Sequence, residues 1–287
     1  MNVEVRHLRA LAAIGDEGTI TDAAIALRVS QPALSRTLEQ LESRLGTRLV
    51  ERTTRSLALT PAGQRLWEHA HRILNQLDDA LAEAAAESAP RPLRAAFAWA
   101  MLGRHTVPLL RAWRELRPDV PVQIRRVDDP EAALRRGEAD VAFLRTSPSA
   151  GLGCLALMRE RRLAAVPDHH PLAGRDAVRL ADLTGEPVVL CATAATSGAE
   201  LWPEEARPHV FQVPGVDEWL TAIATGEAVG VTTEGTSHSH PHPGVHYVAL
   251  ADADPVTVHL AWPDTPVHPA TNAFRELVQR LTTQGTP

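Results

Sequence analysis

The 287-residue sequence predicts an α/β protein that begins with an all-α winged helix-turn-helix domain and continues through a long linker helix. Three observations support this fold class. Residues 18–63 carry leucines and small residues at helical spacing on both sides of a tight turn. An apolar stripe then runs over residues 61–87, and short apolar strands alternate with helical segments beyond residue 93. We expect domains at residues 1–60, 61–89 (the linker) and 90–287.

Two short helices are expected before the turn. The apolar pattern predicts a first helix over residues 4–15 with five side chains inward: Val5, Leu8, Leu11, Ala12 and Ile14. Thr21 is the expected cap of a second helix over about residues 21–27, with Ala24 and Leu27 inward. The small residues Ala23 and Ala24 allow a neighbouring helix to approach closely, as a helix-turn-helix requires.

The third helix is expected over about residues 31–45. Ser30 is a suitable N-cap, Pro32 fits the first turn, and Gly46 ends the helix. One face carries leucines at spacings of four, three and four: Leu34, Leu38, Leu41 and Leu45. A hairpin wing is expected over about residues 47–59.

The polar face of this helix predicts DNA binding. Gln31, Ser35, Arg36 and Gln40 lie away from the leucines, and the first three are near the helix N-terminus. Glutamine can pair with adenine and arginine with guanine, while arginines and threonines of the wing can bind phosphates. The expected DNA-binding residues are Ser30, Gln31, Pro32, Ser35, Arg36, Gln40, Arg52, Thr53, Thr54 and Arg55.

At these positions the chain resembles the LysR-type transcriptional regulators. The family's motifs appear in register as Ala23-Ala24, Ser30-Gln31-Pro32-Ala33-Leu34-Ser35, Leu41-Glu42-Ser43-Arg44-Leu45-Gly46, Leu49-Val50-Glu51-Arg52 and Leu59-Thr60-Pro61-Ala62-Gly63. Two positions depart from the pattern: Val50 replaces a usual aromatic residue, and Ile20 a common Phe. Both are apolar exchanges, so the polar face is unaffected. An ordinary three-helix domain with a solvated polar face is the alternative.

The linker helix is expected to dimerise. Thr60 is its cap and Pro61 its first residue, and a helix to residue 87 is about 40 Å long. Its apolar stripe comprises Leu66, Ile73, Leu74, Leu77 and Leu81. The resemblance implies pairing of this helix between two chains, so that two recognition helices bind two half-sites. Packing of the stripe on the chain's own body is the alternative.

The C-terminal region should form βαβ units. Strands are expected at residues 93–99, 120–127, 139–144, 162–166, 187–192, 210–213, 228–232, 245–250 and 256–261. Helices are expected at residues 104–116, 130–137, 198–205, 216–225 and 268–281. The resemblance implies an effector-binding domain built like a periplasmic solute-binding protein. Its subdomain I would hold about 93–158 plus 263–287, and subdomain II about 159–262.

A small-molecule effector is expected where the parallel strands end. That rule selects Trp99, Ala100, Met101, Arg104, Asp128, Arg145, Thr193, Thr196, Trp219 and Thr232. The aromatic residues and Met101 can form an apolar wall, Arg104 or Arg145 can bind an anion, and Asp128 a cation. Carboxylate-binding relatives carry hydroxyl residues after the first two strands, whereas this chain has Ala100-Met101 and Val127-Asp128. A regulator without a ligand, acting by oligomerisation, therefore stays open.

The composition suggests few further functional sites. The net charge is −6, every one of the 29 basic residues is Arg, and no apolar run is long enough to span a membrane. The two cysteines suggest no disulfide framework, so a reducing cytoplasm is expected. A histidine-rich loop at residues 238–246 suggests metal ligation as a minor alternative, and Cys191 a redox role. We expect no metal, no cofactor and no catalysis.

The sequence thus predicts a cytoplasmic, sequence-specific transcriptional regulator controlled by a ligand in a cleft between two subdomains. Its expected partners are double-stranded DNA, a small-molecule effector and further copies of itself, as a dimer or tetramer, with RNA polymerase as a candidate. The alternative from another class is a solute-binding or enzyme domain whose N-terminal helices only mediate assembly.

Overall fold

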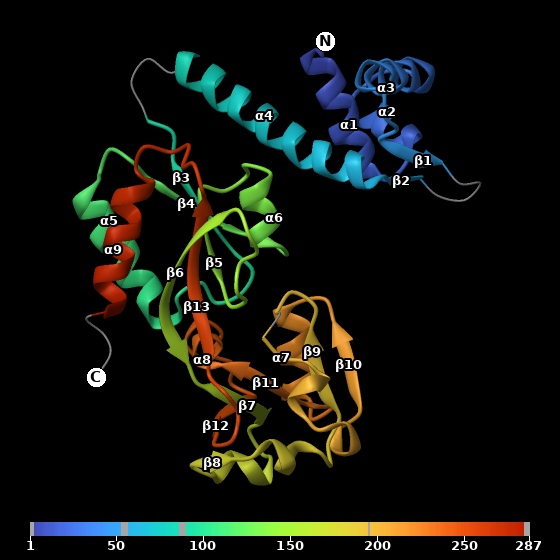
Figure 1. Cartoon of the computed structure of the whole chain (residues 1–287). Coiled ribbons are helices and arrows are strands. Elements are labelled where there is room, and N and C mark those ends of the chain that lie inside the picture. The colour runs from blue at the N-terminus through green and yellow to red at the C-terminus, as the bar shows by residue number, and fades with distance from the viewer. Residues whose placement is uncertain (1–2, 53–56, 86–89, 195, 284–287) are drawn as a thin grey trace. The chain divides into compact units, whose positions relative to one another are not determined.

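The computed structural model describes residues 3–52, 57–85, 90–194 and 196–283 (Figure 1). The chain divides into two compact units, Met1–Arg91 with Arg135–Glu138, and Pro92–Leu134 with Ala139–Pro287. Among the described residues no helix is both long and apolar enough to cross a membrane.

The first unit is a three-helix domain with a two-stranded wing. Its elements are α1 (Val5–Glu17), α2 (Ile20–Ala26), α3 (Gln31–Leu45), β1 (Val50–Arg52), β2 (Leu57–Leu59) and α4 (Pro61–Ala85). The expected core forms, because Leu11, Ile14 and the leucines of α3 are buried together. Two local expectations are wrong. Thr19, not Thr21, caps α2, since its side chain accepts from the Asp22 N–H, and Val5 is 39% exposed at the first turn of α1.

The N-terminal part of α4 is fixed to α1. Thr60 caps α4 as expected, accepting from the Gly63 N–H at 3.0 Å. The Trp67 indole N–H lies 3.2 Å from the Ala12 carbonyl and 3.0 Å from the Asp16 carboxylate, and donates to both. Gly15 is required beneath this ring, because a Cβ at that position would collide with it. The exposed apolar residues lie further along, at Ile73 and Leu81.

The second unit begins with a five-stranded sheet. Its strand order is β4 (Val122–Arg126), β3 (Leu93–Phe97), β5 (Val141–Leu144), β13 (Val256–Pro263) and β6 (Leu152–Glu160). The pairs of β3 with β4 and β5 are parallel, whereas β13 is antiparallel to both of its neighbours. Helices α5 (Thr106–Leu116) and α9 (Thr271–Thr283) pack together beside this sheet (Figure 1). The rings of Trp113 and Phe274 meet edge to face between them. Helix α6 (Pro130–Arg135) packs on a separate, alanine-rich core cluster.

The chain then crosses into a six-stranded sheet. The order is β10 (Val210–Val213), β9 (Val188–Cys191), β11 (Val229–Thr233), β7 (Arg162–Pro167), β12 (Val245–Leu250) and β8 (Ala177–Val178). Helices α7 (Val216–Ala224) and α8 (Glu234–Ser239) and four short 3-10 turns, Pro171–Gly174, Leu180–Leu183, Ala199–Leu201 and Glu204–Ala206, complete this part. The junction β6–β7 leads into the second sheet and the junction β12–β13 leads back.

The architecture confirms the expected fold class and corrects several elements. Residues 198–205 form two 3-10 turns, not an α-helix, and the last helix begins at Thr271. The strand β6 was not expected. Strand β13 pairs within the first sheet, so residues 256–262 differ from the expected assignment to the second subdomain.

Candidate functional site

The helix α3 presents an exposed polar face opposite a buried leucine face. Leu34, Leu38 and Leu41 are each at most 2% exposed. Gln31, Pro32, Arg36 and Gln40 are exposed and Ser35 is half-buried. Ser30 occupies the N-cap position but makes no side-chain capping bond, so its hydroxyl is available to another partner. At the other end, the Gly46 backbone has φ 66°, a left-handed conformation that favours glycine.

A carboxylate joins α3 to the wing. Glu42 Oε1 accepts from the backbone N–H groups of Leu49, at 2.7 Å, and Val50, at 3.2 Å. Strands β1 and β2 then pair antiparallel, with Glu51 opposite Ala58 and Arg52 opposite Leu57. Thr53, Thr54 and Arg55 lie outside the described residues, so their expected phosphate contacts stay predictions. Glu42 thus sets where the wing begins relative to the polar face of α3.

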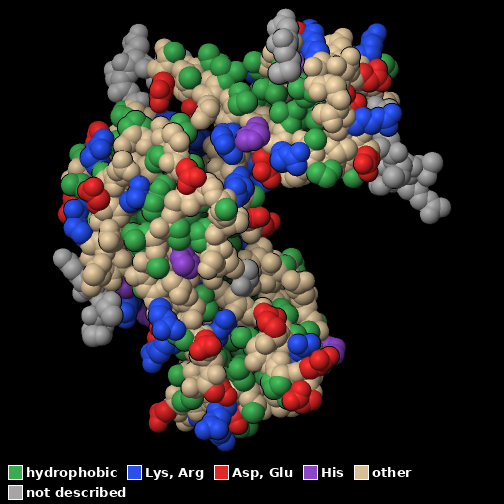
Figure 2. Space-filling model, in the orientation of Figure 1, with side chains coloured by type: hydrophobic (Ala, Val, Ile, Leu, Met, Phe, Trp, Pro, Cys, Tyr) green, Lys and Arg blue, Asp and Glu red, His purple; other side chains and the backbone are tan. Residues whose placement is uncertain are grey.

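The chemistry of this surface suits a nucleic-acid duplex. Exposed amide and guanidinium groups can pair with base edges, and the half-buried serine can contact either bases or phosphate. On the face drawn in Figure 2, basic side chains are interspersed with acidic ones over this unit. Affinity here would therefore depend on a few well-placed groups.

The residues expected to bind an effector are mostly buried in the second unit. Trp99, Ala100, Met101, Arg145, Thr196, Trp219 and Thr232 are buried, Thr193 is half-buried, and Arg104 and Asp128 are exposed. The Trp219 indole N–H donates to the Val189 carbonyl at 2.9 Å, which makes this ring part of the core. The Trp99 indole N–H donates to the Thr236 hydroxyl. Asp129 caps the next helix, since its carboxylate accepts from the Ala132 N–H at 2.9 Å.

Arg145, expected as an anion ligand, already has a carboxylate partner. Its guanidinium pairs with Glu160 through two contacts of 2.9 Å, and both side chains are 5% exposed. It also donates to the carbonyls of Trp99 and Met101. The Thr233 hydroxyl donates to the same carboxylate. These four hydrogen bonds fix the position of the buried guanidinium and use four of its five N–H donors.

This cluster holds an unusual backbone segment. Ala100 and Met101 have φ values of 50° and 37°, in the left-handed region that non-glycine residues rarely adopt. Such strain persists only where neighbouring contacts enforce it. The carbonyls on either side of Ala100 accept from Arg145, so this side chain holds the segment in place.

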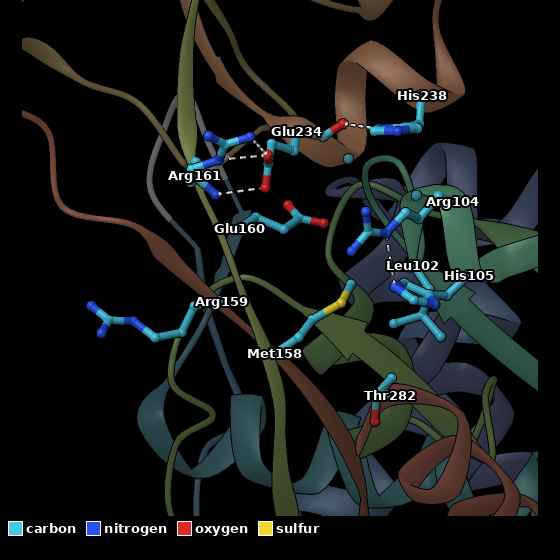
Figure 3. Close-up of a pocket in the computed structure, with 12 residues that line it drawn as sticks. Leu102, Arg104, His105, Met158, Arg159, Glu160, Arg161, Glu234, His238 and Thr282 are labelled. Atoms are coloured by element: carbon cyan, nitrogen blue, oxygen red, sulfur yellow. Dashed lines mark hydrogen bonds and ion pairs between the residues drawn. The ribbon is translucent and has the colours of Figure 1, made fainter. Parts of the chain in front are cut away.

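A pocket of about 620 Å³ lies next to this segment, with Leu102 and Gly103 in its wall (Figure 3). It is lined by Leu102, Gly103, Arg104, His105, Met158, Arg159, Glu160, Arg161, Glu234, Gly235, His238 and Thr282. Of the expected effector residues only Arg104 belongs to this set. Burial lowers the pKa of His105, and the nearby Arg104 and His238 lower it further, while Glu160 raises it. Sequence reasoning missed this pocket because its walls come from segments up to 180 residues apart, which no local motif connects.

The expected alternatives find limited support in the geometry. Among the described residues no group of three or more His, Cys, Asp or Glu side chains is placed to hold a metal ion. The histidine-rich loop is partly helical, since α8 ends at Ser239. Cys191 is buried in a strand, and the Cys154 thiol has its pKa raised by burial. The environment of Cys154 therefore does not activate its thiol as a nucleophile.

Comparison with known proteins finds a matching family model for the N-terminal part of the chain and another for the C-terminal part. Residues 5–64 match the family model "Bacterial regulatory helix-turn-helix protein, lysR family", and residues 86–282 match "LysR substrate binding domain". The HTH-type transcriptional regulator YnfL of Escherichia coli K12 is 33% identical over 276 residues, 92% of this chain and 93% of the relative. BenM of Acinetobacter baylyi is 27% identical over 268 residues, 89% of this chain and 88% of the relative.

Solved structures share the fold over the whole chain. The crystal structure of CbnR, a LysR family transcriptional regulator, has a TM-score of 0.67 at 23% identity and covers 98% of this chain and 99% of its own. A structure of full-length CbnR with its target DNA has a TM-score of 0.65 at 24% identity and covers 97% and 100%. At this identity the likeness establishes the fold.

Proposed function

The chain belongs to the LysR family of DNA-binding transcriptional regulators, and we propose that it contacts operator base edges through the exposed polar face of α3. The single observation that carries this proposal is the sidedness of the helix. Gln31, Arg36 and Gln40 are exposed while the leucines opposite them are buried, so the polar side chains have no role in the core. The relative CbnR is recorded with its target DNA, which supports the same use here.

We further propose that the domains divide as residues 1–60, 61–89 and 90–287, and that α4 pairs with the same helix of a second chain. Along the chain, the first compact unit gives way to the second between Arg91 and Pro92, which supports a boundary near residue 90. Ile73 is 45% and Leu81 58% exposed, and apolar side chains reach the surface along α4 in Figure 2. Pairing would bury this stripe and place two recognition helices for two half-sites. A tetramer and contact with RNA polymerase are extensions of this proposal.

The C-terminal unit would act by binding a small molecule, without catalysis. Its family model is a substrate-binding domain, and the two sheets joined by two crossings suit a ligand that favours one arrangement of them. A regulator that acts by oligomerisation alone is the second candidate, since most of the expected ligand residues are buried. Because its partner is DNA, we place the protein in the cytoplasm.

Binding of the full chain to duplex DNA tests the proposal. The probe is the DNA immediately upstream of its own gene, with a scrambled duplex of equal length as reference. If Arg36 contacts a base, Arg36→Ala should weaken binding by about 1–3 kcal/mol and relax base preference at one position. Arg111→Ala removes the same charge from an exposed site in the second unit, and should leave affinity unchanged.

The form of the loss distinguishes the roles of Arg36. A uniform loss on all duplexes with a shallower salt dependence would make it a phosphate contact. Equal binding of the upstream and scrambled duplexes by the unaltered protein would contradict sequence-specific recognition of this DNA.

A further inference from the structure

We propose that Glu39 determines one base pair of the operator, because its carboxylate accepts a hydrogen bond from the amino group of a cytosine in the major groove. The inference rests on the proposed function, in which the polar face of α3 contacts base edges. Glu39 is not among the residues that the sequence predicts to bind DNA, and a carboxylate selects a different base from the glutamines and the arginine around it.

Glu39 lies on the polar face of α3, close to Arg36. At about 100° per residue, Glu39 and Gln40 each point about 130° away from the middle of the buried leucine face, on either side of Arg36. Four side chains follow the spacing i, i+3, i+4 and i+7 of a single helix face: Arg36, Glu39, Gln40 and Ser43. Homeodomain recognition helices contact bases with residues at this same spacing. Glu39 is therefore placed to reach a groove that Arg36 enters.

The Glu39 carboxylate is available to an outside partner. Its side chain is exposed, and among the residues that the structure describes no hydrogen bond or ion pair involves it. The Arg36 guanidinium, one turn earlier, also makes none within this described part of the chain, although charges three residues apart on a helix can pair. A hollow of about 390 Å³ on this face is lined by Arg36, Glu39, Gln40, Ser43 and Arg44. A donor and an acceptor thus stand beside each other with their hydrogen-bonding atoms unused.

The chemistry of a carboxylate limits what it can contact on DNA. It accepts hydrogen bonds and donates none, and its charge repels phosphate. The donors in the major groove are the N4 amino group of cytosine and the N6 amino group of adenine. Adenine carries the N7 acceptor next to its amino group, which repels a carboxylate, whereas cytosine has no acceptor of its own on this edge. Cytosine is therefore the base that Glu39 selects.

The rise of the helix determines where this cytosine lies. Three residues advance about 4.5 Å along α3, and successive bases of one strand are about 3.4 Å apart. The base pair that Glu39 contacts is therefore one or two steps from the base pair that Arg36 contacts. Since arginine pairs with guanine, each half-site should contain two G·C pairs at this separation, one for each charged side chain.

Selection of bound duplexes from a library of randomised sequence tests the proposal with the full-length protein. We expect cytosine to be enriched at one position of each half-site. Glu39→Gln should change this preference to adenine, because a glutamine amide pairs with adenine N6 and N7. Glu39→Ala should remove the preference. The ratio of the Kd values for duplexes with thymine and with cytosine at this position should then fall about tenfold, the effect of losing one hydrogen bond to a charged group.

Glu115→Gln is the matched control. Glu115 is exposed on α5 in the second unit, and its substitution removes the same charge, so the selected sequences should be those of the unaltered protein. An unchanged base preference in Glu39→Gln would overturn the proposal. An equal change in affinity for all duplexes would also overturn it, since Glu39 would then act only through its charge. Selection of no sequence by the unaltered protein would overturn the proposed function as well, which separates the two failures.

Discussion

Glu42 is a residue of α3 whose side chain positions another element, the wing. Its carboxylate accepts from two consecutive backbone N–H groups, those of Leu49 and Val50, at the entry to the wing. Glu42→Ala would leave both donors without this partner. We expect a loss of about 1.5–3 kcal/mol in the free energy of unfolding of the first unit, measured by urea denaturation.

Glu39→Ala is the control on the same helix. Glu39 is exposed, and Glu39→Ala makes the same change in charge and helix propensity as Glu42→Ala. Its effect on the free energy of unfolding should therefore stay within about 0.5 kcal/mol. Equal effects of the two substitutions would show that the Glu42 hydrogen bonds contribute nothing to stability.

Single residues also show where sequence reasoning ends. The polar face of α3 could be predicted, because helical spacing alone separates Arg36 from the leucines. The surroundings of Arg145 could not. Its partner Glu160 is 15 residues away, and Thr233, which bonds the same carboxylate, is a further 73 residues along. A strand-end rule selects positions, but burial of their side chains is decided by tertiary packing.

At the scale of elements, α4 carries the clearest unpaired surface. Ile73, Leu81, Ala80 and Ala84 are exposed in the single chain. Leu81→Glu would put a charge in the proposed helix–helix contact. We expect it to shift the protein from dimer to monomer in analytical ultracentrifugation, and to weaken binding to a two-half-site duplex by at least about tenfold.

The neighbouring position provides the control. Ala82 is exposed and, one residue on, lies about 100° further around the helix. Ala82→Glu adds the same charge away from the stripe and should leave both measurements unchanged. A dimer that survives Leu81→Glu would place the subunit contact elsewhere.

Elements with strong local patterns were predictable, whereas those defined by distant pairing were not. The helix α3 has the expected bounds, since cap, periodicity and terminal glycine agree. Residues 198–205 lack such agreement: Gly198 and Pro203 interrupt the helical pattern, and only 3-10 turns form there. Strand β13 joins the first sheet because its partners are β5 and β6, more than 90 residues earlier. Periodicity identifies a strand but not its neighbours.

At the scale of the whole molecule, half-buried histidines link folding to pH. The pKa values of His105, His240 and His259 are lowered, in each case chiefly by burial. Nearby charges modify two of these pKa values. Arg104 and His238 lower the pKa of His105 further, whereas Glu160 raises it. Asp217 raises the pKa of His240, whereas Arg126 lowers it. In the unfolded chain the same rings titrate near their ordinary pKa of about 6.5.

The unfolded state therefore binds more protons than the folded state between the lowered pKa values and about 6.5. Above about pH 6.5 the rings are neutral in both states, so the folded state has its full stability. As the pH falls below about 6.5, the unfolded chain takes up protons and the free energy of unfolding decreases. We expect the free energy of unfolding, from urea denaturation followed by tryptophan fluorescence, to decrease between about pH 7.5 and 5.5, a range above most carboxylate titration. A triple variant with His105→Asn, His240→Asn and His259→Asn should give a shallower slope, because it removes the groups that take up the protons. Equal slopes for the two proteins would mean that other groups carry the pH dependence.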